Sequence, residues 1–159
     1  MRLYIKQRVF SVRDKYDIYD ENQNSIFHVW SKIISLGAQI FLCDMNGQEL
    51  YHIKERITMF LKKYELYQGE RLVASIQQNL KLFNNSLSIQ SSYGNFEIQG
   101  DFLAMDFQIY QDGSTIGIIS KKWFSWGDSY ELSIQEGVDA AFFTALVITI
   151  DNCIHNGNG

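Results

Sequence analysis

The sequence contains no proline and only two cysteines in 159 residues. The absence of proline excludes a proline-rich leader. The two cysteines, Cys43 and Cys153, lie far apart in the chain, whereas a disulfide framework would need more cysteines in a shorter secreted chain. Buried free thiols in a reducing compartment agree better with this cysteine usage, and we expect a cytoplasmic protein.

Long apolar runs are also rare. The main one, from Ala140 to Ile150, is bounded by Asp139 and Asp151, and it falls well short of the roughly 20 residues that a transmembrane helix needs. Residues 1–8 alternate between apolar and charged side chains, without the apolar segment of a signal peptide. Because the run has no polar face, we predict a helix over about residues 137–155 that is buried on all sides.

Basic residues are fewer than acidic ones, with 14 Lys and Arg against 18 Asp and Glu. The formal net charge of −4 argues against a nucleic-acid partner, since phosphate contacts require a basic surface. No Gly-x-Gly-x-x-Gly or Walker motif is present, and we expect no cofactor. With 46% hydrophobic and 20% charged residues, the composition is that of one globular domain over residues 1–159.

Aromatic residues, in contrast, are abundant at 14%, which favours β-structure. Strand–turn–strand units recur with a period of about 24 residues, the length scale of internal repeats. The clearest turn is Asn46-Gly47, because a type I′ turn needs positive φ at both central positions. Paired strands are predicted over residues 14–20 and 25–30, 38–44 and 48–54, 63–67 and 71–76, 80–83 and 87–90, and 106–110 and 114–120, with further strands over 96–100 and 129–134.

About a dozen strands over residues 3–135, followed by one apolar helix, predict a mainly β fold. We expect a closed antiparallel β-barrel of about twelve strands around a central hydrophobic C-terminal α-helix, since closure removes exposed strand edges. Alternation along the strands assigns one apolar side to the helix and one polar side to water. The inward set is Tyr16, Ile18, Ile40, Leu42, Tyr64, Leu66, Phe107, Ile109, Tyr130, Leu132 and Ile134, and the outward set is Asp17, Gln39, Glu65, Gln108, Glu131 and Ser133.

Several segments resemble the LURP-one-related proteins, most specifically the stretch Ser-Lys-Lys-Trp-Phe-Ser-Trp-Gly-Asp at residues 120–128. Residues 10–20 and 100–103 also resemble this family, and the similarity runs from about Leu3 to His155, as in its compact bacterial members. The resemblance implies a tubby-like fold, with twelve antiparallel strands around a C-terminal helix. It also implies kinship with the tubby C-terminal domain, which binds phosphoinositides, and with the phospholipid scramblases.

Two basic clusters are candidate binding residues, because positive charge beside tryptophan is typical of contacts with a membrane interface or an anionic headgroup. The alternative is structural, since lysines also protect strand edges and a Trp-Phe-x-Trp turn can cap a barrel end. The candidate residues are Lys62, Lys63, Lys121, Lys122, Trp123 and Trp126.

The leading hypothesis is a non-enzymatic binding module for anionic phospholipid headgroups, in the cytoplasm or peripheral at the membrane. The alternatives are a protein-interaction scaffold and a hydrolase with a pocket at the barrel mouth. His28 and His52 occupy equivalent positions of two repeats and could ligate a metal with Asp44 or Glu49, but closed zinc sites usually need four ligands. We therefore expect no metal, and no catalytic constellation stands out.

Overall fold

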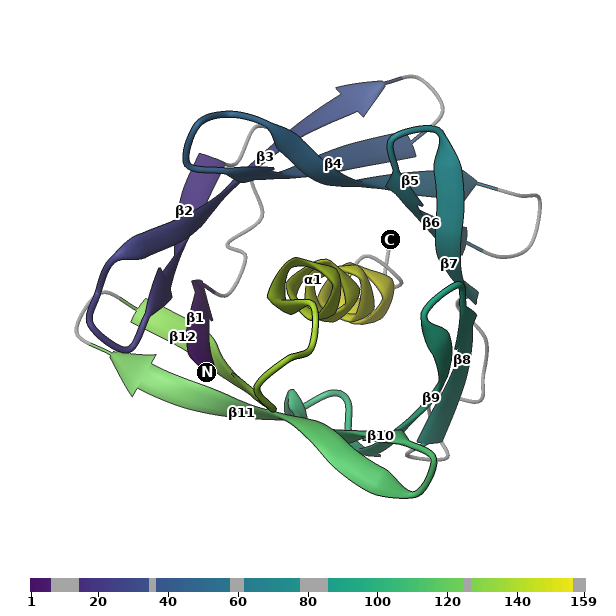
Figure 1. Cartoon of the computed structure of the whole chain (residues 1–159). Coiled ribbons are helices and arrows are strands. Elements are labelled where there is room, and N and C mark those ends of the chain that lie inside the picture. Colours follow the sequence, from purple (N-terminus) through teal and green to yellow (C-terminus); the bar gives the residue numbers. More distant parts are fainter. Residues whose placement is uncertain (7–14, 35–36, 58–61, 78–85, 125–126, 156–159) are drawn as a thin grey trace.

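The computed structural model describes residues 1–6, 15–34, 37–57, 62–77, 86–124 and 127–155 (Figure 1). These residues form twelve β-strands and one α-helix. The elements are β1 (Arg2–Lys6), β2 (Lys15–Asp20), β3 (Ser25–Ile34), β4 (Gly37–Asp44), β5 (Glu49–Ile57), β6 (Lys62–Gln68), β7 (Arg71–Gln77), β8 (Ser86–Ser91), β9 (Gly94–Asp101), β10 (Asp106–Gln111), β11 (Ser114–Phe124), β12 (Gly127–Ile134) and α1 (Ala140–His155).

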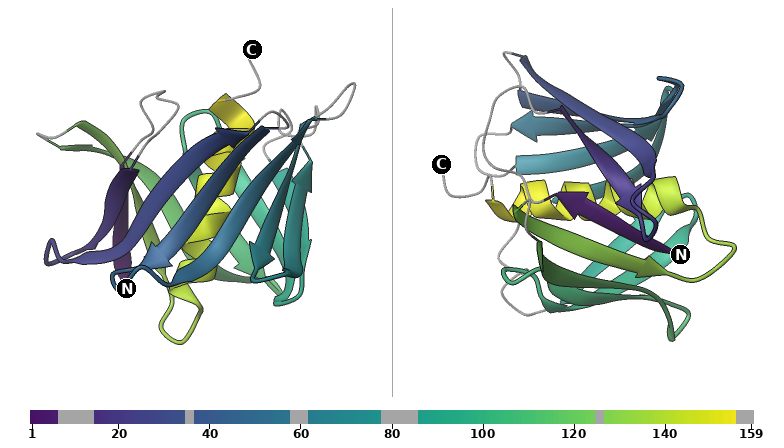
Figure 2. Two further views of the ribbon diagram at one scale, coloured as in Figure 1. Left: turned by 90° about the horizontal axis from the view of Figure 1, so that it is seen from above. Right: turned by 90° about the vertical axis from the view of Figure 1, so that its left-hand side faces the viewer.

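The strands form a closed antiparallel barrel around the helix, as predicted. Each strand pairs with its neighbours in the chain, and β1 closes the barrel by pairing with β12. Figure 2 shows α1 running along the barrel axis. Within the described residues, no helix is long and apolar enough to cross a membrane.

One predicted hairpin falls partly outside the described residues. The segment over residues 87–90 was expected to pair with residues 80–83, which lie outside the described residues. In the structure this segment belongs to β8, whose neighbours are β7 and β9. The turn at Tyr93-Gly94 joins β8 to β9, with Ile89 opposite Phe96, because Gly94 takes the positive φ of 115° that a tight turn requires.

Strand pairing is sparse at two places in the barrel wall. Between β1 and β2 the paired residues are Leu3–Asp20 and Tyr4–Tyr19. Between β7 and β8 the only described pair is Ala74–Ser91, with one more hydrogen bond from a neighbouring amide. Every other neighbouring pair of strands has five or more paired residues within the described part. Both places adjoin stretches outside the described residues, 7–14 and 78–85, and they lie on opposite sides of α1 in the closed barrel (Figure 1); we call them seams.

The core lies between the wall and α1. All side chains predicted to face the helix are buried except Tyr16, which is half-buried against the same core. Of the side chains predicted to face water, Gln108 is exposed, but the others are half-buried on the outer face. Neighbouring side chains cover them, as when Arg56 and Lys63 both bind Glu65.

The helix begins at Ala140, three residues later than the sequence predicted. Gly137 has φ of +86°, a conformation outside the helical region. Asp139 then caps the helix, because its Oδ1 atom accepts a hydrogen bond of 3.0 Å from the amide of Phe142. The polar side chains Thr149 and Asn152 donate to backbone carbonyls one turn earlier, which satisfies them inside the core.

Three tyrosines of the wall attach the helix at both ends. The Tyr51 hydroxyl donates to Asp139 Oδ2 at 2.8 Å, near the helix N-terminus. Near the C-terminus, Tyr64 donates to the carbonyl of Asn152 at 3.1 Å and Tyr130 donates to Asp151 Oδ1 at 3.0 Å. These directional bonds fix the position of a helix that apolar packing alone would hold less specifically.

Candidate functional site

The predicted basic clusters lie on different parts of the barrel. Lys62 and Lys63 begin β6, whereas Lys121, Lys122 and Trp123 end β11. These two strands are on opposite sides of the helix in Figure 1, so the two clusters do not share one surface. Trp126 lies outside the described residues, as do the side chains of Lys62 and Trp123.

Strand alternation also separates neighbouring lysines. Lys121 shares the inward side of β11 with Ile119 and lies opposite Tyr130 in the register. Lys122 points outward, with its Nζ atom 3.9 Å from Glu131 Oε1. Because successive side chains point to opposite faces of a sheet, a Lys-Lys pair within a strand contributes one lysine to each face.

A different set of cations gathers on the outer side of β3, β5 and β6. We call this surface the basic face; it consists of Lys32, Lys54, Arg56 and Lys63. The register places Arg56 directly opposite Lys63, and Lys54 opposite Glu65. Of the predicted binding residues, Lys63 therefore belongs to the basic face.

One carboxylate, Glu65, lies among these cations. It accepts hydrogen bonds from Arg56 Nε and Lys63 Nζ, each at 3.0 Å, and from the Tyr67 hydroxyl at 2.8 Å. Burial raises the pKa of Glu65, but these donors outweigh it and lower the pKa to about 2. Glu65 is thus ionised, and its carboxylate oxygens accept hydrogen bonds from three donors. These bonds fix the positions of Arg56 and Lys63, two of the four cations.

Three aromatic rings stack across the strands next to the basic face. We call Trp30, Phe41 and His52 the aromatic ladder, because they are paired in register on β3, β4 and β5. The Trp30 and Phe41 ring centroids are 4.0 Å apart at an interplanar angle of 10°, and those of Phe41 and His52 are 4.1 Å apart at 19°. Such stacking stiffens the outer surface of the sheet.

The lysines of the basic face pack on aromatic rings. Lys32 Nζ lies 5.1 Å from the centroid of Phe41, and Lys54 Nζ lies 4.5 Å from that of Tyr67, distances typical of cation–π contacts. The ring of His52 responds to this environment: burial, and then the charges of Lys54, Lys32 and Arg56, lower its pKa to about 4. The cations are therefore held above a rigid aromatic layer.

Exposed isoleucines adjoin the basic face at one end of the barrel. Ile33 and Ile34 end β3 and are 57% and 40% exposed, and Ile57 ends β5 and is 61% exposed. We call these three side chains the isoleucine rim. Ile33 and Ile57 directly follow Lys32 and Arg56, so alternation turns these two isoleucines to the opposite side of their strands from those cations. The apolar and cationic groups therefore share one edge of the barrel, at the ends of β3 and β5, but not one face of the sheet.

His28 and His52 do not form a shared site. They lie on β3 and β5, with β4 between them. His28 Nδ1 is 2.7 Å from Asp17 Oδ1, and His52 Nε2 is 3.0 Å from Gln39 Oε1. In the described part of the chain, no three potential metal ligands come together.

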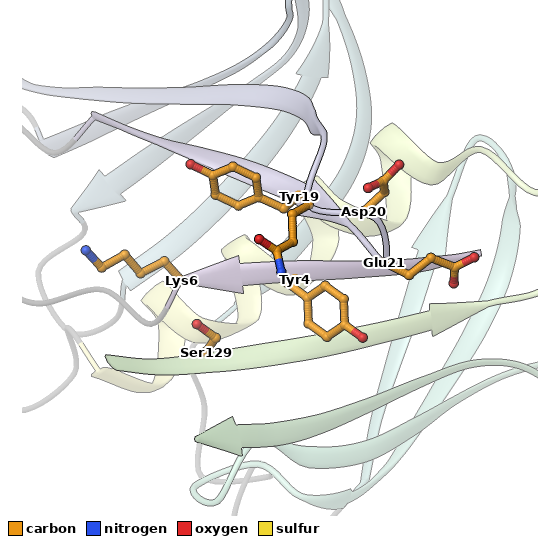
Figure 3. A pocket seen from close by; sticks show the side chains of 7 residues that line it. Tyr4, Lys6, Tyr19, Asp20, Glu21 and Ser129 are labelled. Carbon is orange, nitrogen blue, oxygen red and sulfur yellow. The ribbon is translucent and has the colours of Figure 1, made fainter. Parts of the chain in front are cut away.

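A pocket of about 470 Å³ lies at the seam between β1 and β2 (Figure 3). We call it the seam pocket. Its described lining includes carboxylates but no histidine, so it does not bring together the histidine and acid that would favour the hydrolase hypothesis. The lining residues are Tyr4, Lys6, Tyr19, Asp20, Glu21, Gln23 and Ser129.

The basic face, the aromatic ladder and the seam pocket could not be found from the sequence. Each one joins residues of different strands, and their proximity depends on the register between those strands. The local pattern defines the inward side of a strand, but not which outward side chains become neighbours.

Comparison with known proteins identifies the family. The LURP-one-related family profile matches residues 1–151. The chain is 32% identical over 157 residues to the uncharacterized protein YxjI of Bacillus subtilis, covering 98% of this chain and 95% of that protein. It is 24% identical over 176 residues to Protein LURP-one-related 9 of Arabidopsis thaliana, covering 94% and 89%.

A solved structure agrees in fold. The X-ray structure of a protein from Arabidopsis thaliana superposes with a TM-score of 0.65 at 18% sequence identity, covering 95% of this chain and 89% of that one. At this identity the likeness concerns the fold alone. The match of the family profile, together with the full-length similarity to YxjI, shows that this chain belongs to the LURP-one-related family.

Proposed function

We propose that the protein is a non-enzymatic binding module that docks on anionic phospholipid surfaces through its basic face and isoleucine rim. The observation that carries this proposal is the shared edge: four cations and three exposed isoleucines lie together at one end of β3, β5 and β6. A bilayer surface offers anionic headgroups directly above an apolar layer, which matches both kinds of side chain.

The magnitudes favour reversible docking. A Lys or Arg near an anionic leaflet contributes about 1 kcal/mol, so four cations together with the ionised Glu65 contribute on the order of 3 kcal/mol. Partial burial of the isoleucines adds to this, since complete burial of such a side chain is worth roughly 1.5–3 kcal/mol. Neither contribution is sufficient alone for stable attachment, and the two together suit a peripheral protein.

The overall charge would orient the bound molecule. With a net charge of −4, the remaining surface is repelled by an anionic leaflet while the basic face is attracted. The aromatic ladder and Glu65 hold the cations in place before binding, which reduces the side-chain entropy lost on docking.

The test is flotation of the purified protein with neutral and anionic vesicles at low and high salt. We expect binding to require anionic lipid and to weaken with salt. The variant Lys32→Gln/Lys54→Gln should bind at least about tenfold more weakly, because it loses two cations worth about 1 kcal/mol each.

The matched control is Arg71→Gln/Lys122→Gln, which removes the same charge at β7 and β11, away from the basic face. It should bind like the wild type. If the control lost binding and the Lys32/Lys54 variant kept it, the contact surface would lie elsewhere, as around residues 121 to 126. Failure of the wild type to float with any vesicle would reject the lipid proposal and favour the scaffold hypothesis.

A further inference from the structure

The seam pocket lies at one of the two places where the described strand pairing is sparse. β1 pairs with β12 at five residues but with β2 at only two, and the described pairing with β2 ends at Tyr4–Tyr19. Ser129, opposite Lys6 on β12, is 1% exposed and lies at the base of the pocket. The pocket is therefore bordered by strand backbone on the side where β1 and β2 separate.

Two tyrosines form the middle of the pocket. Tyr4 and Tyr19 are partners across the seam, and Figure 3 shows both between Lys6 and Glu21. Burial, and then a hydrogen bond from the Tyr4 hydroxyl to Glu131, raise the pKa of Tyr4. The hydrogen bond also holds the ring in place. Tyr19 is 39% exposed, so its ring is accessible to a ligand.

The two ends of the pocket carry opposite charge. Lys6 lies at one end, while Asp20 and Glu21 lie at the other (Figure 3). Asp20 is rigid, because its Oδ1 atom accepts hydrogen bonds of 2.8 Å from the amides of Asn22 and Asn24. The ligand must therefore tolerate a fixed carboxylate at one end and an ammonium group at the other.

The spacing between these ends sets the length of the ligand. Asp20 lies opposite Leu3, three residues before Lys6 on β1. At about 3.3 Å per strand residue, the opposite charges are separated by on the order of 10 Å along the strand. Three or four residues of extended chain cover the same distance.

We propose that the seam pocket binds a short extended peptide with free termini, three or four residues long. Its terminal ammonium group pairs with Asp20 and Glu21, its carboxylate pairs with Lys6, and the two tyrosine rings contact its middle. An extended peptide can also hydrogen-bond the strand backbone beside the pocket, the mode of recognition called β-strand addition. A phosphate ligand would be repelled by the carboxylates, and a polyamine by Lys6. This site is separate from the basic face, and the inference does not depend on the proposed lipid binding.

The test titrates the full chain with free trialanine, followed by calorimetry and by NMR shifts of the pocket residues. We expect saturable binding that shifts the signals of Tyr4, Tyr19 and Ser129. N-acetylation and C-amidation of the peptide should each weaken binding about tenfold, since each removes one charge pair. Dialanine should bind more weakly than trialanine because it is too short to reach both ends.

Two variants distinguish recognition of the peptide termini from nonspecific binding. In Lys6→Gln, amidation of the peptide should no longer reduce affinity, while acetylation still does. In Glu21→Gln, the penalty for acetylation should shrink, while that for amidation stays. The matched control Arg71→Gln, at the start of β7, should leave both penalties unchanged. Absence of saturable binding, indifference to both caps, or shifts only outside the pocket would overturn the proposal.

Discussion

The pKa of His52 reflects its burial and the charges of three cations of the basic face, Lys54, Lys32 and Arg56. His52 has a folded-state pKa of about 4 against an ordinary value of 6.5, because burial and three nearby cations disfavour its protonation. Below pH 6.5 the unfolded chain binds a proton that the folded protein does not. Stability should therefore fall as the pH decreases from 6.5 towards 4. We expect the urea midpoint of the wild type to be lower at pH 5 than at pH 7.

The variant His52→Phe removes the titrating group and keeps a ring that can stack on Phe41. Its urea midpoint should change much less between pH 7 and pH 5. Glu65 does not interfere in this range, since the free energy linked to its lowered pKa is lost only below pH 4.5. An equal loss of stability in the variant would show that other groups cause the acid sensitivity.

Among the described glycines, Gly100 in the β9–β10 hairpin has the backbone of the neighbouring strand closest to it. A Cβ atom on Gly100 would lie 2.4 Å from the Asp106 carbonyl oxygen and 2.6 Å from the Cα atom of Phe107. Gly100 also has φ of +140°, which L side chains rarely adopt. Gly100→Ala should lower the free energy of unfolding by more than about 2 kcal/mol, as a backbone clash adds to the strain.

The matched control is Gly113→Ala in the β10–β11 turn. Gly113 has φ of +78°, but its added Cβ atom would meet nothing within 4 Å. This variant should lose only about 1 kcal/mol from the left-handed conformation. Equal losses for the two variants in denaturant unfolding would mean that the close approach at Gly100 has little effect.

The hairpins could be predicted because their signals are local. Period-two alternation identifies the inward side of each strand, and residues such as Asn46 and Gly47 identify the turns. The pairing expected for residues 80–83 lies outside the described part of the chain and stays a prediction. The binding surfaces could not be predicted. Lys32 and Lys63 are placed on one face only by the register between four strands, β3 to β6.

At the scale of the whole molecule, α1 fills the interior of the barrel. Its side chains are buried from Phe142 to Cys153, and the inward side of nearly every strand packs on the same core. Removing residues 137–159 would leave this apolar surface open to water. We expect the truncated chain to be insoluble or to show no cooperative thermal transition by circular dichroism. A soluble truncated chain that melts cooperatively would show that the twelve strands are stable without α1.

The pairing of β1 with β12 has a consequence for biosynthesis. The first strand cannot find its partner until almost every other strand has been translated, and the helix is made after all of them. At about 5–20 residues per second, β1 waits on the order of ten seconds on the ribosome. During this time the nascent hairpins expose strand edges and apolar side chains, the features that invite aggregation before a sheet closes.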